Sequence, residues 1–399
     1  MLNHKTKYEL MEFTYKDQRV NEFKEEFEDK SIAKKVVHLS YEEELEHLLS
    51  SDDPAIFLPS IENMGTLCNI DFTQFLDCVV FTKIAEIANH PLFEDYIVVL
   101  RFFYVLTWNC SDEKELAIFI SPSFLSLLKT FLFINHDNPT FYGYLFHIYG
   151  NIFTKSQFFS EQIFSIAFLR RLFDIVKNLP FISGDFLDLL GCILVRFTIL
   201  MNYDPNPLPT ITEIFSHFLE SSDFQNFSDA FSILARISSL PFHDFLKSFF
   251  TPYIVEKAIE NILVNVNEIV DEEGTAQIGP YKAHKTFINS LKKNSLILLL
   301  NFTAIGEDTQ SILIENTPLL DIDIFSICSS CNDFDDFNEF TVFFPDIASN
   351  FFRSSHSIAI QFAYSTYWQS LSLLIIKVIM KCILLNQFYL NNYVYHFVE

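Results

Sequence analysis

Apolar residues recur at intervals of three and four from about residue 65 onward, and no stretch shows the strict alternation of a half-buried strand. Short polar breaks, several holding a proline, separate apolar segments of roughly 10–18 residues, a usual length for a globular helix. Ser121-Pro122 and Thr251-Pro252 are typical of helix starts, with an N-cap residue followed by proline in the first turn. The chain has only 8 glycines, which disfavours a β-rich fold with many tight turns. The pattern predicts an all-α chain.

A helical unit repeats along the chain. Segments starting at Val99, Tyr142, Phe231 and Ser295 share one order: an apolar helix, a short polar turn, then further apolar helices. A polar residue recurs in the last turn of the first helix, including a weaker copy near 187–218: Asn109, Asn151, Arg196, Arg236 and Asn301. The steps from each to the next are 42, 45, 40 and 65 residues, and three of them fall near the ~40–47 residue period of armadillo and HEAT arrays. Because units of this size bury both helix faces only by stacking, the sequence predicts a right-handed α-solenoid of armadillo/HEAT-like repeats.

Two regions depart from this rhythm. Residues 1–50 are dense in charges of both signs, and we expect them to form a charged N-terminal helical arm. Residues 51–399 are predicted to form the repeat array. The long step of 65 residues contains an acidic, glycine-bearing stretch near 270–280, which is predicted to be an insertion.

The segment from Gln74 to Phe131 resembles an armadillo repeat of the importin-α type. The residues that carry the resemblance read FLDCVVFTKIAEI, then VVLRFFYVLTWN, then SDEKELAIFISPSFLSLL, and the rhythm extends over about residues 70–330. In that family the inner helix of each repeat carries a Trp and, four residues later, an Asn that holds the backbone of an extended peptide. The resemblance places Asn109, Asn151 and Asn301 at the Asn position.

The residues at the other family positions differ from the family pattern. Val105, His147 and Ile297 stand where the family has Trp, and Arg196 and Arg236 replace Asn in the middle repeats. An Arg at the centre of the groove would repel a basic nuclear-localisation peptide. The resemblance therefore implies a protein-binding or peptide-binding scaffold, with a divergent nuclear-transport adaptor as one specific role. The predicted partner-binding residues on the concave face are Asn109, Asn151, Arg196, Arg236, Asn301 and His147.

The competing function is a structural or membrane-associated helical protein, anchored by its apolar C-terminal helix. Residues Leu371–Leu385 are apolar but shorter than the ~20 residues that a spanning helix needs. Lys377 and Lys381 also interrupt them. We therefore expect a buried terminal helix rather than a membrane anchor.

Charge narrows the class of partner further. The net charge of −24 and pI of about 4.7 disfavour nucleic acid as a partner, because nucleic acid binds Lys-rich and Arg-rich surfaces.

The N-terminus is charged from its start and does not resemble a signal peptide, and the seven cysteines form no disulfide framework. We therefore expect a cytoplasmic or nuclear location.

Catalytic and metal-binding motifs do not stand out in the sequence. Cys328 and Cys331 form a lone CxxC without a second ligand pair, so no zinc site is predicted. Phosphate-binding loops, HExxH and Gly-x-Ser-x-Gly do not occur. The sequence therefore predicts a protein that is not an enzyme, with no cofactor, no metal, no catalytic residue and no small-molecule substrate.

Overall fold

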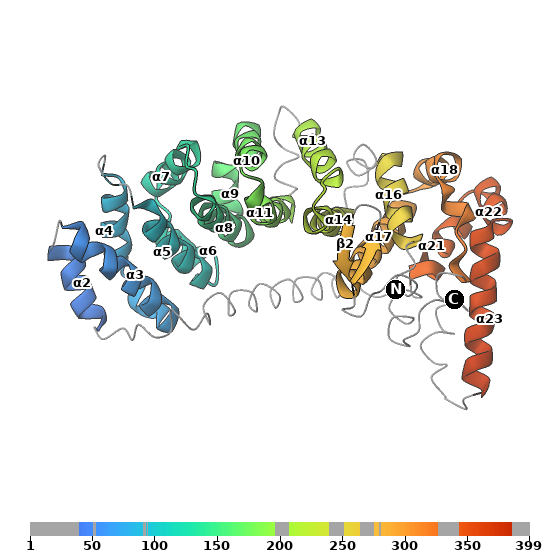
Figure 1. Ribbon diagram of the computed structural model, residues 1–399, viewed down its shortest axis with the longest axis horizontal. Helices are drawn as coiled ribbons and strands as arrows, with labels where there is room; N and C mark the ends of the chain where they lie inside the picture. Colours follow the sequence, from blue (N-terminus) through green and yellow to red (C-terminus); the bar gives the residue numbers. More distant parts are fainter. Residues whose placement is uncertain are drawn as a thin grey trace. The chain divides into compact units, whose positions relative to one another are not determined.

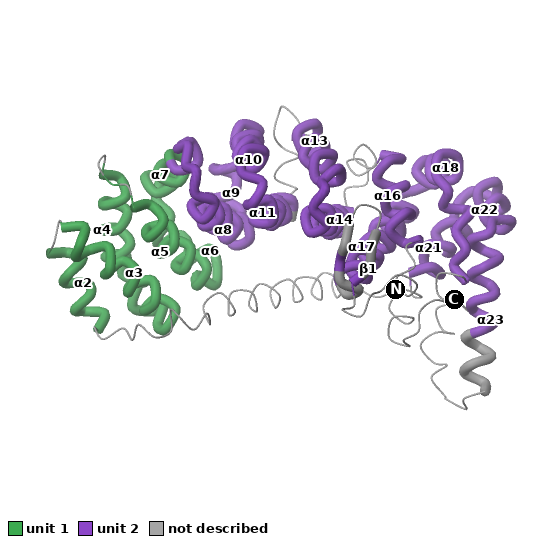
Figure 2. Tube along the Cα trace, viewed as in Figure 1, with its two compact units in different colours: residues 1–130 green, residues 131–399 purple. Residues whose placement is uncertain are grey.

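A computed structural model describes residues 40–50, 53–90, 93, 95–195, 207–238, 251–263, 275–278, 281–325 and 343–384. The chain divides into two compact units, residues 1–130 and 131–399 (Figure 2). Each unit is described by itself.

Unit 1 is a set of short helices joined by tight, capped turns. Its elements are α2 (Tyr41–Ser50), α3 (Pro54–Ile70), the 3-10 helix η1 (Phe72–Phe75), α4 (Val79–Ala88), α5 (Tyr96–Asn109), α6 (Glu113–Phe119) and most of α7 (Pro122–Phe133). The Asp53 carboxylate accepts from the Ala55 amide at the start of α3, and Pro54 supplies the first turn. The Asp112 carboxylate caps α6 in the same way, accepting from the Lys114 and Glu115 amides.

Unit 2 continues with the same kinds of element. They are α8 (Pro139–Lys155), α9 (Gln157–Ile163), α10 (Ile166–Asn178), η2 (Pro180–Ile182), α11 (Ser183–Val195), α13 (Leu208–Leu219), α14 (Phe224–Ser238), α16 (Pro252–Leu263), β1 (Thr275–Ile278), β2 (Tyr281–His284), α17 (Lys285–Thr303), α18 (Glu307–Asn316), η4 (Pro318–Asp321), α21 (Phe343–Phe352), α22 (His356–Ala363) and α23 (Thr366–Leu384).

The repeat is clearest over two consecutive three-helix units. The helices α6, α7 and α8 start at residues 113, 122 and 139, and α9, α10 and α11 start at 157, 166 and 183. Each start in the second group of three helices is 44 residues after its counterpart in the first group. Each group has one short helix followed by two longer ones. A three-helix unit of this period has the armadillo form, so the predicted armadillo-like helical-repeat fold is confirmed.

Hydrogen bonds join positions one repeat apart. Within unit 1, the Cys78 thiol donates to the Ile118 carbonyl, 40 residues away. Within unit 2, Arg170 Nε donates to Thr210 Oγ1, and Gln310 Nε2 to the Asn350 carbonyl, again 40 residues apart. At these described positions of each unit, one repeat therefore contacts the next along the chain, as in a solenoid.

The helices of unit 2 form two rows (Figure 1). In one row α8 packs against α11, α11 against α14 and α14 against α17. In unit 1, α3 packs against α5. We call these six helices the inner helices. Aromatic rings fill the space between the rows, where Phe186 of α11 lies 6.4 Å from Phe173 of α10 and 5.8 Å from Phe218 of α13. This packing uses many of the 47 phenylalanines.

A small hairpin starts within the predicted insertion near 270–280 and extends past it to His284. Strands β1 and β2 pair antiparallel, with Thr275 opposite His284 and Ile278 opposite Tyr281. Four residues per strand is the shortest length over which alternation indicates a strand, so the signal in the sequence is weak. The all-α prediction is confirmed for the architecture, and the hairpin is an addition to it that the sequence analysis did not predict.

The structure describes the last part of the predicted N-terminal arm and the predicted terminal helix. Residues 1–39 of the predicted arm lie outside the described residues. Its last ten residues form α2, which packs against α3 and α4 and buries Leu48, so they belong to unit 1. The predicted terminal helix is α23, which starts five residues earlier, at Thr366. Its burial holds for one face only, because Leu371 and Leu374 are enclosed whereas Leu373 and Ile376 are exposed.

In the described part of the chain, no single helix has both the length and the apolar character to cross a membrane. The bent pair α6 and α7, at 81° to each other, meets the two criteria only in combination.

Candidate partner-binding surface

A polar row follows one face of the two inner helices of unit 1. On α3, Glu62, Thr66 and Asn69 lie at intervals of four and three residues, which places them on one side of the helix. On α5, Arg101 and Asn109 lie eight residues apart, two helical turns. The rows face each other because α3 and α5 pack side by side.

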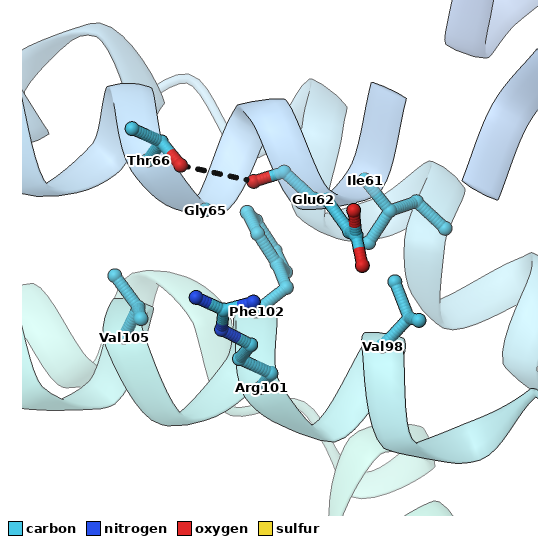
Figure 3. Close-up of a pocket in the computed structure, with 8 residues that line it drawn as sticks. All are labelled: Ile61, Glu62, Gly65, Thr66, Val98, Arg101, Phe102 and Val105. Carbon is cyan, nitrogen blue, oxygen red and sulfur yellow. Dashed lines mark hydrogen bonds between the residues drawn. The ribbon is translucent and has the colours of Figure 1, made fainter. Parts of the chain in front are cut away.

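A shallow hollow separates these helices, and Figure 3 shows Glu62 and Thr66 on one side of it and Arg101 and Val105 on the other. Its volume is about 10 Å³, room for roughly one water molecule. Pockets that enclose a small molecule measure about 300–1,000 Å³. The hollow can therefore receive the tip of a side chain but cannot enclose a ligand.

Asn69 and Asn109 form an amide pair at the C-terminal end of this row. Asn109 Nδ2 donates to Asn69 Oδ1 at 3.0 Å and to the Val105 carbonyl at 2.9 Å. These bonds use both N–H groups of Asn109 and one acceptor of Asn69. Asn69 Nδ2 and Asn109 Oδ1 have no partner among the described residues, and both side chains are half-buried. The pair thus presents one amide donor and one amide acceptor at the surface.

The corresponding face of unit 2 carries a contact between a histidine and an aspartate. His147 Nε2 of α8 lies 3.2 Å from Asp185 Oδ1 of α11, with the side chains 26% and 35% exposed. Gly143, one turn before His147, makes room for this contact, since a Cβ there would lie 3.1 Å from Asp185 Oδ2. The missing side chain lets the carboxylate reach across α8 to the imidazole.

Arg236 and Asn301 also lie against the neighbouring inner helix. A Cβ on Gly191 of α11 would lie 3.4 Å from Arg236 Nη1, so the guanidinium rests on the α11 backbone. Asn301 Nδ2 donates to Ser238 Oγ at 2.8 Å, which links α17 to α14. Asn109, His147, Arg236 and Asn301 thus occupy one kind of position, the contact line between consecutive inner helices.

Two of the predicted partner-binding residues are not part of the proposed surface. Asn151 is 2% exposed, so its amide is enclosed by α8 and its neighbours, and we leave it out of the proposed surface. Arg196 lies outside the described residues. Val105 and Ile297, at the family's Trp positions, are buried and half-buried respectively.

Sequence reasoning missed Glu62, Thr66 and Arg101 of the polar row, and also Asn69, Asp185 and Ser238. Asn69 could have been found, because it precedes Asn109 by 40 residues, close to three of the four steps between the other anchors. Asp185 and Ser238 had no such signal, because their importance depends on the partner that the fold brings near them.

The Cys68 thiol of α3 is held in its protonated, unreactive form. Burial, with a smaller effect of Cys110, raises the pKa of the Cys68 thiol to about 12, so the thiol is protonated at neutral pH. No three His, Cys, Asp or Glu side chains gather as metal ligands in the part of the chain that the structure describes. Cys328 and Cys331 lie outside that part. The described geometry offers hydrogen bonds and charge for binding.

Comparison with known proteins agrees with the fold but gives no relative. No protein-family profile and no curated protein sequence matches the chain. The crystal structure of an engineered protein aligns with a TM-score of 0.54 at 12% identity, covering 82% of this chain and 77% of that one. A designed armadillo repeat protein aligns over 83% of this chain and 100% of its own, at 8% identity and a TM-score of 0.35, too loosely to carry an argument.

The molecule is therefore a helical-repeat protein with armadillo-like units. The likeness to the engineered protein, at 12% identity, concerns the fold alone.

Proposed function

We propose that this chain is a non-enzymatic scaffold that binds an extended segment of a partner protein along its inner helices. The observation that carries the proposal is the Asn69–Asn109 pair. The two side chains bond to each other and leave the amide NH2 group of Asn69 and the carbonyl oxygen of Asn109 for a third group.

A peptide backbone is the natural counterpart of such a pair. Each peptide unit offers one acceptor and one donor, and in an extended segment they are not used internally. The mutual hydrogen bond fixes both side chains before binding, which lowers the entropy cost of ordering them. The hollow beside Arg101 could receive one side-chain tip of such a segment.

The charged residues of unit 2 support recognition of charged side chains. Arg236 offers a cation, and Asp185 beside His147 offers an anion. Opposite charges of this kind give specificity more than affinity. We propose that they select partner segments of mixed charge.

A nuclear-transport adaptor is one specific role within this class, and a cytoplasmic or nuclear location goes with it. Val105 is buried where the importin-α-like pattern has an exposed Trp, so the slot for a lysine stem is missing from this repeat. Titration of the full chain with a labelled basic localisation peptide distinguishes the roles. Saturable binding at micromolar peptide supports transport, whereas no binding at tens of micromolar leaves a general adaptor.

Selection from a display library of random extended peptides tests the scaffold proposal. The full chain is expected to enrich a defined set of sequences, and the double variant Asn69→Ala/Asn109→Ala is expected to lose them. Asn178→Ala is the matched control, because Asn178 Nδ2 also donates to a carbonyl four residues earlier but lies on α10, outside the inner row. The proposal would be contradicted if the wild type enriched no defined sequences. It would also be contradicted if the Asn69→Ala/Asn109→Ala variant enriched the same sequences as the wild type and Asn178→Ala do.

A further inference from the structure

An asparagine amide joins α17, the last of the six inner helices, to α21, which packs against it. Asn350 Nδ2 on α21 donates to the Leu300 carbonyl at 3.3 Å and to Thr303 Oγ1 at 3.0 Å, both on α17. The contact has the same form as the one from Asn301 of α17 to Ser238 of α14. The line of polar contacts therefore continues past the six inner helices onto α21.

The hydrogen bonds around Asn350 use the donors of the side chains that make them. Both N–H groups of the Asn350 amide are taken by α17, and the Thr303 hydroxyl donates to the Leu300 carbonyl at 2.8 Å. Gln310 of α18 uses its N–H groups on the Thr303 and Asn350 carbonyls, at 2.8 and 3.2 Å. The side-chain oxygen of Asn350, Oδ1, has no donor among the described residues. This position therefore presents an acceptor without an accompanying amide donor.

Asn350 is held in place without being enclosed. The Gln310 side chain is 4% exposed and bonds to both α17 and α21, so it fixes the backbone at Asn350. Gln310 Oε1 is an enclosed polar atom without a partner, whereas Asn350 Oδ1 is not enclosed and its residue is half-buried. Asn350 Oδ1 is thus the acceptor of this group that a partner can reach. Because it is already fixed, binding costs little entropy of ordering.

The charges on the same elements favour a neutral donor for this oxygen. Asp346, one turn earlier on α21, and Glu307 and Asp308, at the start of α18, are exposed carboxylates. A cationic side chain forms its stronger, charge-assisted bonds with such carboxylates rather than with an amide oxygen. Arg353, exposed just after α21, would also repel it. The backbone N–H of an extended segment is a neutral donor that is not used internally.

We propose that Asn350 is a further binding residue, whose side-chain oxygen accepts a hydrogen bond from a backbone N–H of the partner segment. This inference rests on the proposed function, because the occupant is the same extended segment. Adjacent packed helices lie about 8–10 Å apart, a distance that an extended chain spans in about three residues. The bound segment therefore continues about three residues beyond the contact line between α14 and α17.

Amide-to-ester replacement, position by position, in a library-selected peptide tests this assignment, because each ester removes one backbone N–H. We expect one ester to weaken binding to the wild-type chain about threefold to tenfold, the range for one hydrogen bond. The same ester should have no effect on binding to Asn350→Ala. It should keep its effect on Asn69→Ala/Asn109→Ala and on Asn316→Ala. Asn316 is the matched control, because its Nδ2 also donates to a backbone carbonyl but lies at the exposed end of α18.

Asn350→Ala should fold, because the Leu300 carbonyl also accepts from the Ala304 amide and the Thr303 hydroxyl keeps its own bond. Circular dichroism melting checks this, and Asn350→Leu, which keeps the shape of the side chain without its polar atoms, repeats the test.

Two outcomes would overturn the assignment. If Asn69→Ala/Asn109→Ala weakens binding but every ester keeps its effect on Asn350→Ala and Asn350→Leu, this assignment fails and the proposed function stands. If the wild type selects no peptide, the proposed function fails and the assignment fails with it.

Discussion

At the scale of single residues, the inner-helix surface depends on where side chains are short or absent. Gly143 admits the Asp185 carboxylate to His147, and Gly191 admits the Arg236 guanidinium. Asn69 and Asn109 are short enough to bond to each other and still present polar atoms to solvent. Small residues at these positions thus let polar groups bridge consecutive helices without leaving the surface.

Alanine substitutions at two helical glycines should differ because of this contact. In Gly65→Ala the new Cβ meets nothing within 4 Å, so the gain in helix propensity should stabilise the fold by about 0.5–1 kcal/mol. In Gly143→Ala the Cβ would lie 3.1 Å from Asp185 Oδ2, and displacing that carboxylate should cancel most of the gain. Urea unfolding of both variants measures the difference, and equal stabilisation would contradict the proposed contact.

At the scale of elements, consecutive inner helices pack through aromatic rings and share polar contacts at their edges. Phe146 of α8 lies 6.3 Å from Phe186 of α11, and both rings are fully buried. The His147–Asp185 pair joins the same two helices at the surface. Packing therefore holds the inner row together, and the polar contacts, which are partly exposed, contribute little to stability.

Removal of one ring should loosen a specific pair of helices. Phe146→Ala should cost about 3–5 kcal/mol, because the site is fully enclosed. Hydrogen exchange should rise first in α8 and α11 and later in α17, since each repeat contacts only its neighbours. Phe181→Ala removes an exposed ring and should change neither quantity. A uniform rise over all helices would show that unit 2 unfolds as one body.

The elements that the sequence could predict are those with a strong periodic signal. The apolar spacing and the Ser-Pro and Thr-Pro breaks located the helices, and the recurring polar anchor located the repeat. The hairpin β1–β2 gave only a weak signal, because four residues is the shortest length over which alternation indicates a strand. Side-chain pairs such as His147–Asp185 could not be predicted either, since the two residues are 38 apart and meet only through the packing of α8 on α11. The burial of Asn151 likewise depends on its neighbours rather than on its own spacing.

At the scale of the whole molecule, the chain combines an acidic repeat array with two different surfaces. Each unit has inner helices with polar contacts at their edges, which suits binding of an extended segment. The last described helix of unit 2, α23, instead exposes the apolar side chains of Leu373 and Ile376. Because the two surfaces lie on different elements, variants can remove one and leave the other in place.

The affinity of the full chain for a library-selected extended peptide, measured by calorimetry, tests the central claim most directly. Each lost hydrogen bond should cost about 0.5–1.5 kcal/mol. The Asn69→Ala/Asn109→Ala variant should therefore bind roughly tenfold more weakly than the wild type, while Asn178→Ala binds as the wild type does. Equal affinity for all three proteins would contradict the claim that the Asn69–Asn109 pair holds the backbone of a partner.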